Sequence, residues 1–229
     1  MVLALRRVGR PSLPACQGRR TLTPPLLSAR AVARTYGRVV ALAPASLEVG
    51  GGDALALIGP NGAGKSTLLS ILAGALEPSS GSVETGPFDH REPRVGWVPQ
   101  KPAHYQRLTP RENLELFARL EGLEQAGEVA DRFIALLEVP DDGRLTEELS
   151  AGNQQRLNLA VALLGKPDVL LLDEPTASLD PARRTELAEL LRNLVQQGRT
   201  LVIATHDDDF ARGCATRILR VEEGRVAGA

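Results

Sequence analysis

A glycine-rich turn ending in Lys-Ser-Thr, at residues 59–67, most constrains how this chain can fold. It follows the short apolar stretch 54–58 and precedes leucines at helical spacing, which predicts a buried strand, a turn and a helix in that order. Glycines let successive backbone N–H groups point inward, and the helix N-terminus adds partial positive charge. The pattern therefore predicts an anion-binding loop within an α/β fold. The loop consists of Gly59, Pro60, Asn61, Gly62, Ala63, Gly64, Lys65, Ser66 and Thr67, and the leucines are Leu68, Leu69, Leu72 and Leu76.

Two side chains of this loop carry chemistry of their own. Lys65 is placed to reach the β- and γ-phosphates of a nucleotide, and the Ser66 hydroxyl is placed to ligate Mg²⁺. Kinases, GTPases and motor ATPases share such a loop. By itself, the loop therefore predicts nucleotide binding but not the class of enzyme. The sequence has no Asn-Lys-x-Asp segment of the kind that selects guanine, which favours ATP over GTP.

A second apolar run, 169–172, leads directly into Asp173 and Glu174. A continuous apolar run is typical of a central parallel strand that is covered on both faces. Ligands of α/β sheets bind at the carboxyl ends of such strands, so Asp173 is expected to hold Mg²⁺ directly or through water. Glu174 projects differently and is expected to accept a hydrogen bond from an attacking water.

Composition excludes several classes of protein. The chain is 43% hydrophobic and 24% charged, which allows a substantial buried core. No apolar run approaches the ~20 residues of a membrane-spanning helix. Two cysteines, Cys16 and Cys214, make neither a disulfide framework nor a four-ligand zinc site and favour a reducing compartment.

Charge is distributed unevenly along the chain. The net charge is −1, but eight arginines and no acidic residue precede Glu48, so residues 1–47 carry +8 and the remainder carries −9. Residues 1–28 hold four prolines and lack the apolar stretch of a secretory signal. We predict a disordered, basic, proline-rich extension there, although its composition also fits an organellar transit peptide or a start codon placed too early. Residues 1–28 hold no aromatic side chain that could stack on bases, so direct nucleic-acid binding is not expected.

The segment Leu149-Ser150-Ala151-Gly152-Asn153 precedes an amphipathic helical pattern, and Ser150 is a good N-cap for that helix. The segment resembles the Leu-Ser-Gly-Gly-Gln signature of ATP-binding cassette (ABC) proteins. The resemblance extends from about residue 29 along most of the chain. It departs from the family pattern at Ala151, where glycine is usual, and at Asn153, where glutamine is usual. The matching positions occur in the family's order: Tyr36, Gly59–Thr67, Gln100, Leu149–Asn153, Asp173–Glu174, Ser178–Asp180 and His206.

The resemblance implies roles for further residues. Tyr36 would stack on adenine, and Gln100 would contact Mg²⁺ or the attacking water. His206 would contact the γ-phosphate and orient the water. The family presents Ser150, Ala151, Gly152 and Asn153 to the nucleotide of a second subunit, and Asp180 acts across the same interface. Asp180 followed by Pro181 also fits an ordinary helix N-cap.

The implied fold is an α/β P-loop NTPase core, a mostly parallel sheet flanked by helices. An N-terminal antiparallel β subdomain and an inserted helical signature subdomain at about 109–165 would complete a nucleotide-binding domain over 29–229. A capping box at Thr109-Pro110-Arg111-Glu112 supports a helix there. The region 101–108 is expected to meet a membrane subunit.

The function implied by the family is an ATP-binding and ATP-hydrolysing subunit that powers an ABC membrane transporter through ATP-driven head-to-tail dimerisation. The short spacing from Lys65 to Gln100 resembles export-type cassettes. The expected partners are a second nucleotide-binding subunit, identical or not, and integral-membrane permease subunits. The expected location is the cytoplasmic face of the membrane. Two alternatives remain open: a soluble ABC ATPase that acts on a protein partner, as in iron–sulfur cluster assembly, and a nucleic-acid-associated or ribosome-associated ABC protein.

Overall fold

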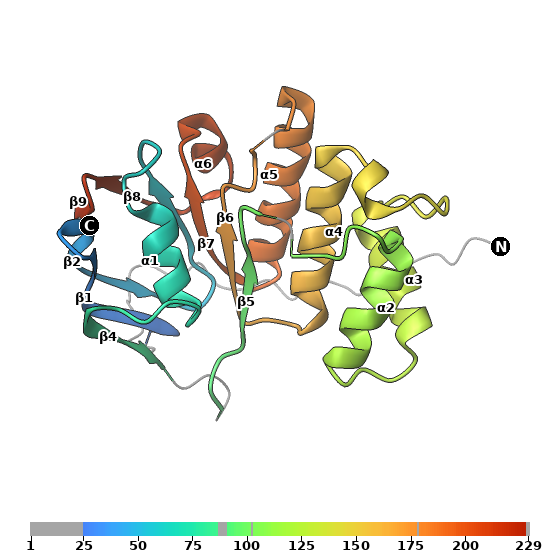
Figure 1. The fold of residues 1–229 in the computed structure, drawn as a ribbon, viewed down its shortest axis with the longest axis horizontal. Coiled ribbons are helices and arrows are strands. Elements are labelled where there is room, and N and C mark those ends of the chain that lie inside the picture. The colour runs from blue at the N-terminus through green and yellow to red at the C-terminus, as the bar shows by residue number, and fades with distance from the viewer. Residues whose placement is uncertain (1–24, 87–90, 102, 178, 228–229) are drawn as a thin grey trace, which may run out of the picture.

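A computed structural model describes residues 25–86, 91–101, 103–177 and 179–227. The chain forms two sheets and six α-helices in these ranges (Figure 1). The strands are β1 (Leu27–Tyr36), β2 (Val39–Val49), β3 (Ala54–Ile58), β4 (Ser80–Thr85), β5 (Val95–Val98), β6 (Val169–Asp173), β7 (Thr200–Thr205), β8 (Arg217–Glu222) and β9 (Arg225–Ala227). The helices are α1 (Lys65–Leu72), α2 (Pro110–Leu120), α3 (Ala126–Leu137), α4 (Ala151–Leu164), α5 (Pro181–Gln196) and α6 (Asp208–Cys214), with a 3₁₀ turn η1 at Thr146–Glu148.

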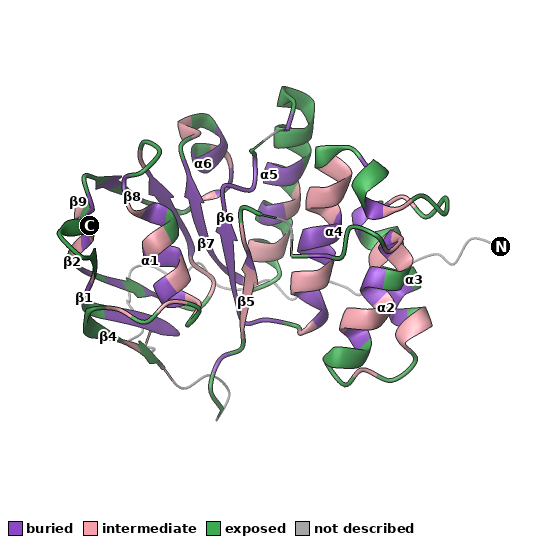
Figure 2. Cartoon of the chain, in the orientation of Figure 1, coloured by how far each residue is buried: buried purple, intermediate pink, exposed green. Residues whose placement is uncertain are grey.

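The larger sheet is mostly parallel, with strand order β5-β6-β7-β3-β8-β9 and only β9 antiparallel to its neighbour. The strands β6 and β7 are buried along their whole length (Figure 2). Their side chains alternate between two cores, because Leu170 and Leu172 join the core that also contains α2 to α6, whereas Val169 and Leu171 join the core around α1. Burial on both faces explains why these strands are continuous apolar runs.

The smaller sheet is antiparallel, with strand order β2-β1-β4. It packs against α1, which lies between the two sheets and contributes Leu68, Leu69 and Leu72 to their shared core. The predicted architecture, a mostly parallel P-loop core with an N-terminal antiparallel β unit, is confirmed. The third strand of this sheet, β4, was not predicted, since its sequence Ser-Gly-Ser-Val-Glu-Thr lacks an apolar alternation.

The helices α2 and α3 lie at the end of the molecule opposite the antiparallel sheet (Figure 1). With η1 and α4 they occupy the stretch in which the helical subdomain is predicted. The capping box of α2 is present, since Glu112 N donates to the Thr109 hydroxyl and Thr109 N donates to the Glu112 carboxylate. None of the helices in the described ranges combines the length and apolarity needed to cross a membrane.

Two details differ from the sequence-based expectation. Helix α1 ends at Leu72, so Leu76 packs against the core from the turn after the helix. In α3, Val129 and Leu137 are buried, whereas Leu136 is 63% exposed because it lies off the face that packs on the core. Of the predicted N-terminal extension, residues 1–24 lie outside the described ranges, and Leu27 and Ser28 already belong to β1.

Candidate functional site

A cavity of about 350 Å³ lies where the glycine-rich loop meets the carboxyl ends of the central strands. Three separately predicted segments meet there: the loop, Gln100 after β5, and Glu174 after β6. Strand order explains the convergence, because parallel strands end at one edge of the sheet. The lining residues are Ala41, Asn61, Gly62, Gly64, Lys65, Ser66, Thr67, Gln100 and Glu174.

The loop is supported from the antiparallel sheet and from the β8–β9 turn. Gly64 has φ 102°, and a Cβ on it would lie 2.6 Å from the Ala41 carbonyl oxygen, so only glycine fits. Gly224 N donates to Ala63 O at 2.9 Å, and Ala43 N donates to Gly224 O at 2.8 Å. Ala41, which sequence reasoning missed, therefore forms part of the wall because β2 runs directly against the loop.

The Lys65 side chain is only 4% exposed and is held inside the loop. Its Nζ donates to Gly59 O at 2.7 Å and to Pro60 O at 3.1 Å. Lys65 Nζ also lies 3.2 Å from Glu174 Oε1, so the two groups form an ion pair, although their geometry is not that of a hydrogen bond. The ammonium is thus fixed at the wall of the cavity by backbone oxygens and a carboxylate.

Ser66 and Asp173 meet at the same wall, with the Ser66 hydroxyl donating to Asp173 Oδ1 at 2.9 Å. Burial raises the pKa of Asp173, and the hydrogen bond from Ser66 opposes that shift. In the described ranges, no three His, Cys, Asp or Glu side chains gather into a metal site of protein ligands alone. A hydroxyl and one carboxylate fit Mg²⁺, which usually completes its coordination with water and substrate phosphates.

Glu174 and His206 form a direct pair, since Glu174 Oε2 lies 2.8 Å from His206 Nδ1. They follow β6 and β7, which are adjacent strands with Asp173 opposite Ala204. Glu174 is buried and has φ 47°, a left-handed conformation that costs a glutamate about 1–3 kcal/mol. Glu174 N donates to Ala204 O at 2.8 Å, so the neighbouring strand end holds this strained backbone in place.

Tyr36 lies at the end of β1 and is half-exposed, outside the cavity lining. The Arg34 guanidinium lies 4.6 Å from the centroid of the Tyr36 ring, and its Nη1 donates to Glu77 O at 2.8 Å. Arg34 therefore covers one face of the ring. Sequence reasoning missed this contact, although two residues two apart on a strand share a face. Stacking of Tyr36 on adenine stays a prediction.

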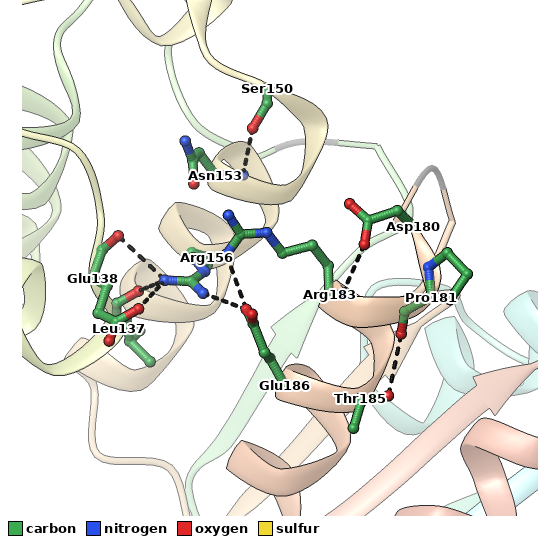
Figure 3. Close-up of polar contacts among 10 residues, drawn as sticks. All are labelled: Leu137, Glu138, Ser150, Asn153, Arg156, Asp180, Pro181, Arg183, Thr185 and Glu186. Carbon is green, nitrogen blue, oxygen red and sulfur yellow. Dashed lines mark hydrogen bonds and ion pairs between the residues drawn. The ribbon is translucent and has the colours of Figure 1, made fainter.

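The signature segment, residues 149–153, does not line the cavity beside Lys65. Ser150 caps α4 by accepting from Asn153 N at 3.4 Å, and Asp180 caps α5 by accepting from Arg183 N at 2.9 Å (Figure 3). The described residues that line the cavity beside Lys65 include no residue from 150–153 and not Asp180. One chain therefore presents the phosphate loop and the signature segment as two separate surfaces. Ser178, which belongs to the same motif as Asp180, lies outside the described residues.

The chain matches the model of a known protein family. A family model described as ABC transporter matches residues 42–177, which is more than half of the chain. The predicted positions from Gly59 to Glu174 fall within the match. The other predicted positions fall outside it: Tyr36, Ser178–Asp180 and His206.

Individual relatives and solved structures agree with this match. The chain is 39% identical over 202 residues to the daunorubicin resistance ATP-binding protein DrrA3 of Streptomyces coeruleorubidus, covering 84% of this chain and 64% of that protein. It is 38% identical over 210 residues to the sulfate/thiosulfate import ATP-binding protein CysA of Vibrio cholerae, covering 85% of this chain and 55% of that protein. The chain thus spans less than two thirds of both. The dimeric structure of the ATP-binding cassette MJ0796 bound to ADP and Pi matches with a TM-score of 0.79 and 28% identity, covering 88% of this chain and 97% of that one.

Proposed function

Because the chain belongs to the ABC transporter family, we propose that it is an ATP-binding and ATP-hydrolysing subunit that powers a membrane transporter by ATP-driven head-to-tail dimerisation. One observation carries the proposal: Lys65, Ser66, Gln100 and Glu174 line one cavity, while the signature segment of the same chain lies away from it. A second chain in head-to-tail arrangement would supply the missing wall. The dimeric structure of the similar MJ0796 cassette supports dimerisation.

The loop binds the triphosphate. Its backbone N–H groups and the N-terminus of α1 face the phosphate oxygens, and Lys65 neutralises charge at the β- and γ-phosphates. Ser66 and Asp173 would hold Mg²⁺, and Gln100 borders the same space. When bound, Mg²⁺ neutralises charge on phosphate oxygens.

Glu174 is the proposed general base. Its carboxylate accepts a proton from water as the water oxygen bonds to the γ-phosphorus, and the bond to the β–γ bridging oxygen breaks to leave ADP. His206 Nδ1, 2.8 Å from Glu174 Oε2, fixes the direction of that carboxylate. Lys65 Nζ lies 3.2 Å from the other oxygen, so its positive charge faces the carboxylate within a buried wall.

The second chain contributes the signature segment. Ser150, Gly152 and the N-terminus of α4 would face the γ-phosphate bound to the first chain, with Asp180 beside them. Loss of the γ-phosphate removes contacts from both chains, so the dimer reopens. Ala151 keeps the backbone N–H of the usual glycine, whereas Asn153 is one methylene shorter than the usual glutamine.

The proposed partners are permease subunits in the membrane, contacted by the segment 101–108, which places the chain at the cytoplasmic face. Export is the proposed direction, supported by the short spacing from Lys65 to Gln100 and by the resistance protein among the relatives. The similarity to an import protein makes a transport assay with a co-purified permease the test of direction. No observation favours the soluble alternative.

The test of ATP-driven dimerisation uses the Glu174→Gln variant, which keeps the cavity but lacks the base. With ATP and Mg²⁺ it should elute as a stable dimer in size-exclusion chromatography with light scattering, and it should hydrolyse ATP far more slowly than the unmodified chain. The Lys65→Ala/Glu174→Gln double variant is the control and should remain monomeric. A Glu174→Gln variant that stays monomeric with saturating ATP would refute the proposal.

A further inference from the structure

The guanidinium of Arg156 on α4 joins three helices (Figure 3). Its Nη1 donates to the Glu138 carboxylate at 2.7 Å and to the carbonyls of Leu137 and Glu138 at the end of α3. Its Nη2 donates to Glu186 Oε2 on α5 at 2.7 Å. The side chain is 19% exposed, so this arginine is partly shielded from water and geometrically constrained.

We call the contact between Arg156 and Glu186 the bridge. On the α5 side, the bridge is hydrogen-bonded to the residues that form the N-cap of α5. Glu186 Oε2 also accepts from Arg183 Nη1 at 2.9 Å, and the backbone N–H of Arg183 donates to the Asp180 carboxylate. Arg183 thus belongs to both the cap and the bridge. One carboxylate oxygen of Glu186 therefore connects α4 to the turn of chain that presents Asp180.

The signature segment rests on the same turn. A Cβ on Gly152 would lie 3.5 Å from Leu179 Cδ2 and 4.0 Å from Arg183 Cγ, both ordinary van der Waals contacts. A cavity of about 420 Å³ lies between α4 and α5, and Arg156, Glu186 and Gly152 are among its lining residues. Within the described chain, Arg156–Glu186 is the one ion pair or hydrogen bond that joins these two helices.

We infer that Arg156 and Glu186 are positioning residues that hold the signature segment and Asp180 as one rigid unit for the nucleotide of a second chain. The inference rests on the proposed head-to-tail function, in which both elements act across the interface. Without the bridge, α4 and α5 would shift independently across the cavity, and dimer formation would have to order them. The bridge lies away from Lys65 and the loop, so it should leave nucleotide binding by a single chain unchanged.

The test is Glu186→Gln in the Glu174→Gln background, followed by light scattering as ATP is titrated. Glu186 has a half-exposed side chain, so its amide variant should fold normally. The matched control is Glu189→Gln on the same helix, where the carboxylate pairs only loosely with Arg192 at 3.9 Å. The half-maximal ATP concentration for dimerisation should rise about fivefold for Glu186→Gln, the size expected from one charged pair, and stay unchanged for Glu189→Gln. The affinity of each monomer for a fluorescent N-methylanthraniloyl ATP should be equal.

Arg156→Lys provides the second variant, because lysine keeps the charge but does not span both carboxylates. It should shift dimerisation in the same direction, and adding it to Glu186→Gln should give less than the sum of the two effects. Equal ATP dependence for Glu186→Gln and Glu189→Gln, fully additive effects, or an equal loss of monomer affinity would each overturn the inference. If Glu174→Gln alone never dimerises, the proposed function fails and the inference with it, so the two failures are distinguishable.

Discussion

Replacing Asn113 with leucine should destabilise the fold strongly although the two side chains are similar in size. Asn113 lies on α2 with 0% exposure. Its carboxamide accepts from Tyr105 N at 2.7 Å and donates to Tyr105 O at 2.9 Å and to Thr146 Oγ1 at 3.1 Å. These bonds join the segment that precedes α2 to the 3₁₀ turn that precedes the signature segment.

The size of the effect follows from which partners lose their bonds. Tyr105 N loses its acceptor, which costs about 1–3 kcal/mol. Tyr105 O still accepts from Leu108 N at 3.3 Å, and the Thr146 hydroxyl still donates to Leu108 O at 2.6 Å. These two groups keep a partner, so each should add no more than about 0.5–1 kcal/mol. The free energy of unfolding should therefore fall by about 2–5 kcal/mol.

Urea denaturation followed by far-ultraviolet circular dichroism measures the change. Asn193→Leu, at an exposed position on α5, is the control and should stay within about 0.5 kcal/mol of the unmodified chain. Hydrogen exchange should also show that the Tyr105 amide loses protection selectively. A stability loss below about 0.5 kcal/mol for Asn113→Leu, with Tyr105 still protected, would refute the reasoning.

Three further predictions concern other parts of the chain. Tyr36→Ala should weaken binding of fluorescent ATP by about 1–3 kcal/mol, as expected for loss of a base–aromatic stack, while Tyr36→Phe should bind normally; equal binding by both would reject stacking. Burial would raise the pKa of Asp168, but hydrogen bonds from Arg91 and from the backbone of Arg94 hold it below its usual range. The Asp168 carboxylate thus stabilises the fold above its unfolded-state pKa of about 3.9, and this stabilisation is lost as the pH falls below that value. Asp168→Asn should therefore reduce the dependence of the free energy of unfolding on pH in this acidic range. Burial lowers the pKa of His104, whose ring nitrogens have no hydrogen-bond partner in the described ranges, so stability should fall as pH drops below about 6.5 and His104→Leu should remove that dependence.

Sequence patterns formed by neighbouring residues predicted much of the fold. The loop at 59–67, the apolar run before Asp173 and the caps at Thr109, Ser150 and Asp180 each combine residues close in sequence, and the structure has the strands and helices they predict. Strand β4 lacks such a signal, because it is a mostly exposed edge strand whose place depends on pairing with β1.

The arrangement of the site depended on contacts between distant residues. The juxtaposition of Glu174 and His206 follows from β6 lying beside β7, a pairing that no local pattern reports. The strained backbone of Glu174 and the bridge from Arg156 to Glu186 likewise arise only from packing. The chemistry of the residues therefore identified Glu174 and His206 as candidates, but it did not predict the distance between them or their contacts.

Complementation between two inactive variants is the most direct test of whether each ATP site is built from two chains. Lys65→Ala removes the phosphate contact, and Gly152→Asp places a carboxylate where the signature segment should face the γ-phosphate. Each variant alone should lack ATPase activity. A 1:1 mixture should regain ATPase activity, because each mixed dimer joins the intact loop of one chain to the intact signature segment of the other and so has one intact site of two. A mixture no more active than its components, or full activity of Gly152→Asp alone, would show that an ATP site does not need two chains.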